Sequence, residues 1–205
     1  VIEHLGGRVV FCDIDPITFN IDINQIESKI TNKTKAILPV HLFGLSADMD
    51  PINEIAKKNN LWVIEDAACG FGATYKGSHV GNLGTAGCFS FHPRKAITTG
   101  EGGMVIFKDK KTLDHAKMLR DHGMSKEKKY WHEFIGFNYR MTNMQAAIGV
   151  AQMEVVNNFV QAKQFIAEEY NKNIKSIDGI QLPNNSGNII NSYWLYTIVL
   201  PQDLS

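Results

Sequence analysis

A strong excess of charge of one sign is absent from this sequence. It contains 21 basic and 21 acidic side chains in 205 residues, so its formal net charge at pH 7 is zero. This balance does not favour nucleic acid or an anionic membrane as a partner. Long apolar runs are also missing, and none approaches the roughly eighteen residues of a membrane-spanning helix. The start, VIEHLGG, lacks the basic and apolar regions of a signal peptide. We therefore expect a soluble protein.

Cysteine is scarce as well. Cys12, Cys69 and Cys88 are odd in number, far apart and without CxxC spacing, which argues against a disulfide framework and against a zinc site. This usage fits a reducing, cytoplasmic compartment. Hydrophobic residues make up 44% of the chain and charged residues 20%, and a chain of this length can bury a sizeable core. The composition is that of a globular protein.

Strands and helices are predicted to alternate through the first part of the chain. The apolar runs at residues 8–12, 36–40 and 61–64 are typical of strands. Between them, Asp22 offers an N-cap with Gln25 three residues later, and Asp50 offers a cap followed by proline at the first helical position. This alternation predicts an α/β fold with a mostly parallel sheet.

Helices dominate the second part. We predict them at residues 113–121, from a capping box of Thr142 and Gln145 to residue 155, and then to about residue 177. The alternation of aromatic and aliphatic residues over 193–200 predicts strands of a smaller second domain. The chain begins with valine and stops just after this run, so we expect a fragment.

The candidate chemistry lies in four features of the glycine-rich central part. Asp66 ends the strand that begins at residue 61, Ser90 lies in another strand, Lys95 follows five residues later, and the turn at 100–103 comes next. Open α/β folds bind ligands at the carboxyl edge of the sheet, where Asp66 is expected. Taken singly, each feature has a plain alternative: a cap or ion pair, a hydrogen-bonded serine, or a solvated lysine.

Together, these features and the sequence segments around them resemble a known family. The segments are VIEDAACGFGATYKGSHVGNLGTAGCFSFHPRKAITTGEGGMV, PVHLFGLSADMD, VVFCDIDPITFNID and GFNYRMTNMQAAIG. They resemble the DegT/DnrJ/EryC1/StrS family of pyridoxal-phosphate-dependent sugar aminotransferases over nearly the whole chain. The resemblance implies the PLP-dependent transferase fold type I, the fold of aspartate aminotransferase, with pyridoxal 5'-phosphate (PLP) at the carboxyl ends of the strands.

The resemblance also implies a domain organisation. Residues 1–155 would be part of the PLP-binding large domain, whose N-terminal portion lies outside this sequence. Residues 156–205 would form a linking helix and the start of a small C-terminal α/β domain, also truncated.

Roles follow from the resemblance residue by residue. Lys95 matches the lysine that forms an imine with the cofactor aldehyde and later moves a proton. Asp66 matches the carboxylate that keeps the ring nitrogen protonated, and Ser90 the phosphate-binding serine. Asn138, in GFNYR, matches an asparagine that reaches the phosphate of the neighbouring subunit, which would share each active site across a homodimer. Its alternative is a turn residue before Thr142.

Cys69 departs from the family's pattern. It stands three residues after Asp66, where relatives often carry a polar side chain that bonds the ring hydroxyl of the cofactor, and a thiol is only a weak donor. Cys69 either keeps a weakened contact or packs against the ring. His41 and His92 flank the site in sequence, but we take both as hydrogen-bonded structural residues.

The resemblance implies an enzyme that moves an amino group from an amino acid, glutamate in the family, to a nucleotide-linked keto sugar, for surface polysaccharide or related amino-sugar biosynthesis. Three alternatives stay open. One is a regulatory or sensory protein that binds PLP or a sugar nucleotide without turnover. Another is a sugar dehydratase of the same fold, although relatives of that kind carry histidine where Lys95 stands. The last is another nucleotide-binding α/β domain, for which the chain lacks a GxGxxG or GxxxxGK[ST] loop after a strand.

Overall fold

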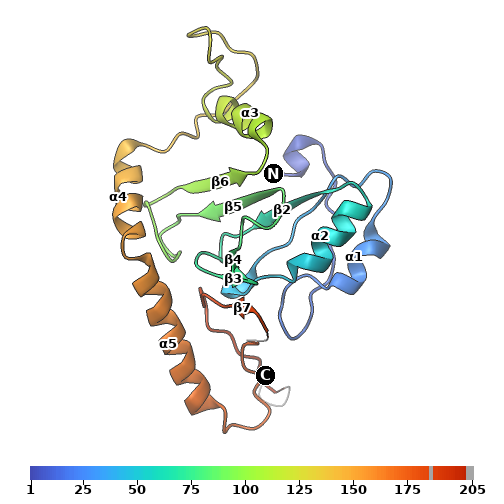
Figure 1. Ribbon diagram of the computed structural model, residues 1–205, viewed down its shortest axis with the longest axis vertical. Coiled ribbons are helices and arrows are strands. Elements are labelled where there is room, and N and C mark those ends of the chain that lie inside the picture. The colour runs from blue at the N-terminus through green and yellow to red at the C-terminus, as the bar shows by residue number, and fades with distance from the viewer. Residues whose placement is uncertain (185–186, 202–205) are drawn as a thin grey trace.

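The computed structural model describes residues 1–184 and 187–201, and Figure 1 shows their arrangement. The α-helices of these residues are α1 (Ile23–Lys29), α2 (Met49–Lys58), α3 (Lys110–Arg120), α4 (Asn143–Met153) and α5 (Val156–Ile174). The strands are β1 (Ala36–Ile37), β2 (Trp62–Asp66), β3 (Thr74–Tyr75), β4 (Ser78–His79), β5 (Ala86–Ser90), β6 (Gly103–Phe107) and β7 (Ile189–Ile190). Two short 3-10 helices are η1 (Glu3–Leu5) and η2 (Leu42–Gly44).

A mixed sheet of strand order β1-β2-β5-β6 forms the centre of the molecule (Figure 1). β1 pairs with β2 and β2 with β5 in parallel, whereas β6 runs antiparallel to β5. The sheet is therefore mostly parallel, and the predicted α/β class is confirmed. A small antiparallel sheet of order β4-β3-β7 lies beside it and joins the C-terminal part of the chain to the central part.

The main core lies between the sheet and the helices α1 and α2, which Figure 1 shows beside β2. Its larger buried side chains come from both helices and from β1, β2 and β3: Ile26, Ile37, Met49, Ile52, Val63 and Tyr75. Full burial of one such apolar side chain contributes roughly 1.5–3 kcal/mol. This cluster therefore holds the parallel strands in place.

The start of α2 is decided by a tertiary contact. The sequence predicted a helix capped by Asp50, but α2 begins at Met49 and its N-cap is Asp48. The hydroxyl of Tyr75, from β3, donates to Asp48 Oδ1 (2.5 Å) and accepts from the backbone N–H of Asp50 (3.3 Å). This hydroxyl satisfies one of the backbone donors that a helix start leaves free, so the helix begins earlier than its proline suggested.

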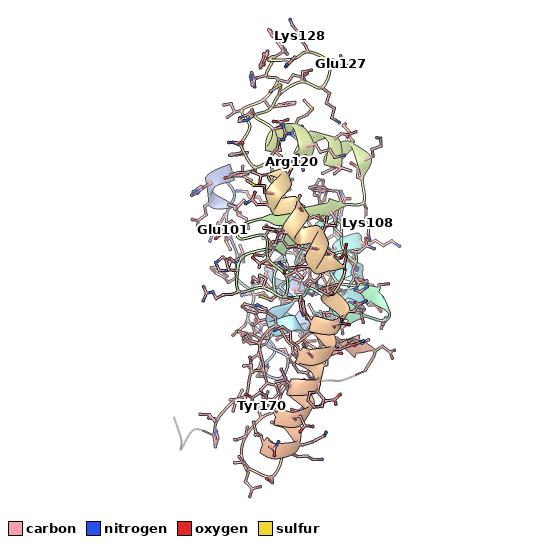
Figure 2. All side chains as sticks on the ribbon, turned by 90° about the vertical axis from the view of Figure 1, so that its left-hand side faces the viewer. Glu101, Lys108, Arg120, Glu127, Lys128 and Tyr170 are labelled. Atoms are coloured by element: carbon pink, nitrogen blue, oxygen red, sulfur yellow. The ribbon has the colours of Figure 1, made fainter. Side chains whose placement is uncertain are left out.

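The capping box of α4 is confirmed. Gln145 N donates to Thr142 Oγ1 (3.2 Å), and Thr142 N donates to Gln145 Oε1 (2.9 Å). α3 begins three residues before the predicted start because Asp109 caps it, accepting from Thr112 N at 2.6 Å. α4 and α5 follow one another along one face of the molecule, as Figure 2 shows. No helix of the described ranges is long and apolar enough to cross a membrane.

Two predicted strands are wrong. Residues 8–12 form no ladder, and Val10 and Phe11 are exposed there. Residues 193–200 form only one bridge, between Gln181 and Val199, and the C-terminal strand is instead β7. An apolar extended run becomes a strand only where a partner's backbone groups lie alongside it. The domain boundary predicted after residue 155 falls between α4 and α5, and it stays a prediction.

Candidate active site

The carboxyl edge of the two central parallel strands brings Asp66 and Ser90 together. Asp66 is the last residue of β2 and Ser90 the last of β5. Asp66 pairs with Cys88, so Ser90 lies two positions further along the neighbouring strand. Because side chains alternate between the faces of a sheet, the side chains of Asp66, Cys88 and Ser90 share one face.

Backbone bonds fix Asp66 on both sides. Its N–H donates to Pro39 O (2.9 Å), and its carbonyl accepts from His41 N (3.0 Å). Its carboxylate oxygen Oδ1 accepts from Ala68 N at 3.0 Å, and no ion pair within residues 1–184 and 187–201 involves this carboxylate. Asp66 thus presents a negative charge without a cationic partner at the edge of the sheet.

The charge of Asp66 acts on two thiols. Burial raises the pKa of Cys88, and the nearby Asp66 carboxylate raises it further. The pKa of Cys69 is also raised, chiefly by burial and in part by Asp66, although the hydrogen bond from Lys95 opposes this shift. Both thiols are therefore neutral near pH 7. Cys88 was not singled out from the sequence, although its spacing of two from Ser90 on one strand is the signal that would have found it.

Lys95 lies in the loop after β5, where its backbone N–H closes a turn by donating to His92 O (2.9 Å). Its amine Nζ donates to Cys69 Sγ at 3.3 Å and lies 4.0 Å from the ring centroid of Trp194. No carboxylate of the described residues forms an ion pair with this amine. The structure therefore places Cys69 against Lys95, and the amine is free of a competing salt bridge.

Trp194 reaches this site from the C-terminal part of the chain. Its indole Nε1–H donates to the carbonyl of Arg94 at 2.8 Å, across 100 positions of sequence. No spacing or local motif links Trp194 to Lys95, because the contact depends on how α5 returns the chain to the sheet. The sequence predicted a strand at this point and missed the contribution to the site.

The loop between β5 and β6 supplies small polar groups beside Ser90. Ser90 Oγ accepts from His92 N (3.3 Å), and Ser90 pairs with Gly103 across the ladder. The Glu101 carbonyl accepts from Thr99 Oγ1 (2.9 Å), while the Glu101 side chain is exposed (Figure 2). Glu101 therefore acts on its turn through its backbone carbonyl, and its carboxylate also lies 3.9 Å from His92 Nε2. The hydroxyl of Ser90 keeps capacity for a further bond.

Asn138 lies apart from these residues in the chain. It lies in the segment between α3 and α4, next to the C-cap residue of α3, and it is exposed. Asn138 forms a bridge with Asp121 and no turn before Thr142, so the turn alternative is wrong. No contact within the described ranges joins Asn138 to Asp66, Ser90 or Lys95. Its part in a neighbouring subunit's site stays a prediction.

His41 and Glu65 form a buried pair next to Asp66. His41 Nδ1 accepts from Ala47 N (3.1 Å), so its Nε2 carries the hydrogen and donates to Glu65 Oε2 at 2.8 Å. Glu65 also accepts from the backbone N–H groups of Gly81, Leu83 and Gly84, at 2.6, 2.7 and 2.5 Å. Burial would raise the pKa of Glu65, but the bonds from His41 and from Gly84 and Gly81 outweigh it and lower that pKa. The structural role expected of His41 is confirmed, and Glu65 is a partner that the sequence did not single out.

These groups suit a phosphate-bearing aldehyde. An amine, a carboxylate without a cation and a hydroxyl lie along one edge of the sheet. In contrast, no cluster of three or more histidine, cysteine or acidic side chains that could hold a metal occurs in the described part of the chain.

The chain is similar to a known protein family and to several named proteins. The sequence model described as "DegT/DnrJ/EryC1/StrS aminotransferase family" matches residues 1–205. A protein named GDP-perosamine synthase, from Escherichia coli O157:H7, is 46% identical over 97% of this chain and 54% of its own length. A protein named UDP-2-acetamido-2-deoxy-3-oxo-D-glucuronate aminotransferase, from Pseudomonas aeruginosa, is 40% identical over 96% of this chain and 54% of its own length.

Solved structures agree with these sequence matches. The structure of Helicobacter pylori PseC, described as an aminotransferase involved in the biosynthesis of pseudoaminic acid, aligns with a TM-score of 0.94 at 30% identity. The alignment covers 98% of this chain and 55% of that structure. The chain spans about half the length of the curated relatives it matches.

Proposed function

The chain belongs to the DegT/DnrJ/EryC1/StrS aminotransferase family, and from this membership and the geometry around Lys95 we propose that the protein is a PLP-dependent aminotransferase of nucleotide-linked keto sugars. The observation that carries the proposal is the Lys95 amine, which has no carboxylate partner in the described ranges and lies beside the edge that bears Asp66 and Ser90. The amino donor in this proposal is an amino acid, glutamate in the first instance. The cytoplasm is the proposed compartment.

The side chains at the edge fit the proposed cofactor. When bound, PLP supplies an aldehyde that takes up an amino group and a ring that withdraws electrons from the reacting carbon. Lys95 provides the amine that holds the aldehyde. Asp66, which has no cationic partner among the described residues, would hold a proton on the ring nitrogen through an ion pair. Ser90 and the backbone N–H groups of its loop would bind the phosphate.

Lys95 would also carry the proton of the reaction. With a donor amine in place of Lys95, the free lysine Nζ would be available to take a proton from one carbon and return it to another. The half-buried position of Lys95, beside Cys69 and Trp194, limits the access of water to Nζ. The same lysine then serves again when the keto sugar replaces the keto acid.

The proposal covers a class of sugars and not one substrate. The names of the two relatives contain different nucleotides, GDP in one and UDP in the other. The described site contains groups for the cofactor and the reacting amine, and these groups do not distinguish between the nucleotides. A nucleotide-linked keto sugar is therefore the level at which the substrate is proposed.

A homodimer with shared active sites completes the proposal. α4 has no buried residue, and its exposed apolar side chains are Met144, Ile148, Val150 and Met153. A helix face of this kind in a folded protein marks a contact surface. Figure 2 shows α4 and α5 along an open face of the molecule. In a symmetric dimer the segment with Asn138 could reach the site of the partner.

The test is the visible absorption spectrum of the full-length protein after addition of PLP. Wild type should show the band of a lysine-bound cofactor, Lys95→Ala should not, and Lys108→Ala, which removes an exposed lysine after β6 (Figure 2), should behave as wild type. Glutamate should abolish the band by converting the cofactor, and steady-state plots should be parallel, as a two-step reaction requires. A band that glutamate leaves unchanged would favour the non-catalytic binder, and a wild type without a band would refute the cofactor assignment.

A further inference from the structure

Trp194 and Lys95 form a contact that the proposed reaction does not yet explain. The Lys95 amine lies 4.0 Å from the centre of the Trp194 ring, over its face, and 3.3 Å from Cys69 Sγ. We infer that Trp194 is a positioning residue: its indole holds the Lys95 amine at one place whenever that amine is not covalently bound. This inference rests on the proposed function and adds a residue from the C-terminal part of the chain to it.

The indole itself is held in a fixed orientation. Its Nε1–H donates to the carbonyl of Arg94, which is the residue directly before Lys95. The bond therefore ties the ring to the same loop that carries the amine. The amine of Lys95 therefore cannot move relative to the backbone of its loop without changing its position over the Trp194 ring. A hydrogen bond of 2.8 Å is of normal length for this donor and acceptor.

The backbone around Trp194 is anchored to η2. Ser192 N donates to Gly44 O (3.0 Å), and Leu195 N donates to Phe43 O (3.3 Å). Gly44 has a φ of +102°, and a Cβ at this position would lie 2.7 Å from the backbone nitrogen of Trp194. Only glycine allows this close approach. The segment that carries Trp194 is therefore docked by main-chain bonds on both sides of the ring.

Strained backbone occurs on both sides of this contact. Phe43 has a φ of 58° and Tyr193 a φ of 48°, a region that side chains other than glycine rarely adopt. Such residues raise the free energy of the backbone and are concentrated at functional sites. Here the strain lies directly beside Gly44 and Trp194. This pattern is expected where a strained backbone conformation is needed to position a side chain at a site.

The contact differs from the other cation–aromatic contacts of the described residues. Lys128 lies over Trp131, Lys129 over Tyr130 and Lys76 over Tyr75, each within three positions in sequence. Those pairs arise from local chain geometry. The Lys95 pair joins two distant segments, and Lys95 is the one lysine that the reaction uses. Its amine faces an aromatic ring and a neutral thiol, and neither binds it as tightly as a carboxylate would.

A weak site of this kind suits an amine that must leave and return. A lysine side chain has many rotamers, and each return to the reacting carbon would require a search among them. An aromatic face attracts an ammonium group without neutralising it. The amine can therefore rest on Trp194 and still be released to take part in the next step.

The first measurement uses full-length protein without cofactor, so that it does not depend on activity. Surface acetylation with a limiting reagent is followed by mass spectrometry, and labelling of Lys95 is compared with that of Lys108 in the same sample. Trp194→Leu should raise the relative labelling of Lys95 between about 2-fold and 30-fold, the range expected for loss of a cation–π contact. Trp194→Phe keeps a ring but lacks the bond to Arg94, and its increase should be smaller but at least about 2-fold.

The matched control is Trp62→Phe. Trp62 begins β2, at the opposite end of the strand from Asp66, and is half exposed. This variant should leave the labelling of Lys95 unchanged. Circular dichroism of each variant checks that it is folded. If Trp194→Leu does not fold, the Phe variant alone decides.

A second measurement uses the loaded enzyme. If Trp194 positions the amine, Trp194→Leu should slow a single turnover with glutamate by a factor in the same range, while KM for glutamate changes less than about 2-fold. Equal labelling of Lys95 in wild type and in every folded Trp194 variant would overturn the inference. A wild type that binds no PLP would instead overturn the proposed function, and the labelling result would still stand.

Discussion

His41 Nε2 lies 2.8 Å from Glu65 Oε2, and neither side chain has any exposed surface. Glu65 is one residue before Asp66, on the opposite face of β2, where it pairs with Gly87. Its carboxylate accepts backbone N–H groups of the loop 81–84, while His41 accepts one from Ala47. The pair therefore ties two loops to the end of the strand that carries Asp66.

Glu65→Gln should lower the free energy of unfolding by about 2–6 kcal/mol, because about 1–3 kcal/mol is lost for each of two buried donors, on His41 and Gly81, that are left without an acceptor. The amide of glutamine keeps one acceptor oxygen but directs an NH2 group at donors that need an acceptor. Urea denaturation followed by fluorescence measures the change.

The control for this variant is Glu27→Gln. Glu27 pairs with Lys58 at 2.7 Å, but the two side chains are 53% and 71% exposed. Surface pairs of this kind contribute about 0–1 kcal/mol, so Glu27→Gln should change stability by no more than that. The role assigned to Glu65 would be wrong if both variants lost the same amount.

Stability should depend on pH through Glu65. Because folding lowers the pKa of Glu65, the unfolded chain binds this proton more tightly than the folded chain. The contribution of Glu65 to the stability of the fold is therefore complete above its pKa in the unfolded chain, about 4.3. It is lost as the pH falls below that pKa and through the lower pKa of the folded chain. Urea titrations between pH 3 and 7 should show a smaller decrease for Glu65→Gln than for wild type. Identical pH profiles would contradict this prediction.

Gly87→Ala should disrupt the edge that carries the site. A Cβ at Gly87 would lie 2.0 Å from Gly81 O and 2.4 Å from Gly81 Cα, and backbone atoms cannot yield that space cheaply. We expect a loss of about 3 kcal/mol or more, as for overpacking in a closed core. Gly77→Ala meets nothing within 4 Å and only has to adopt a φ of +80°, so it should cost about 1 kcal/mol. Thermal unfolding compares the two, and equal losses would show that the contact at Gly81 is not rigid.

Mixed dimers test the part assigned to Asn138. If Asn138 serves the partner's site, Lys95→Ala and Asn138→Ala proteins, each impaired alone, should regain activity when they are co-expressed. Random association gives hybrid dimers with one intact site each, so about a quarter of wild-type activity should return. Activity no higher than the mean of the two parents would show that Asn138 does not act across an interface.

Some features of this protein were readable from short stretches of sequence. Thr142 and Gln145 predicted the start of α4 because a capping box involves residues three positions apart. The apolar runs that became β2 and β5 predicted that Asp66 and Ser90 lie on strands, and Asp66 at the carboxyl edge of the sheet, where open α/β folds bind ligands. That these two strands are neighbours came only from the structure. These signals lie within short stretches of sequence, because the interactions behind them join residues that are close together in the chain.

Other features were decided only by tertiary contacts. Tyr75 moved the start of α2, and the absence of a neighbouring strand left residues 8–12 without a ladder. Glu65 found its partner His41 across 24 positions of sequence, and Trp194 reached the loop of Lys95 across 100. No spacing in the sequence predicts such contacts. They depend on the path of the chain, and that path is set by the sum of a large number of small packing energies. The sequence by itself thus predicted Lys95, Asp66 and the sheet edge near which they lie, and the tertiary structure decided which side chains surround them.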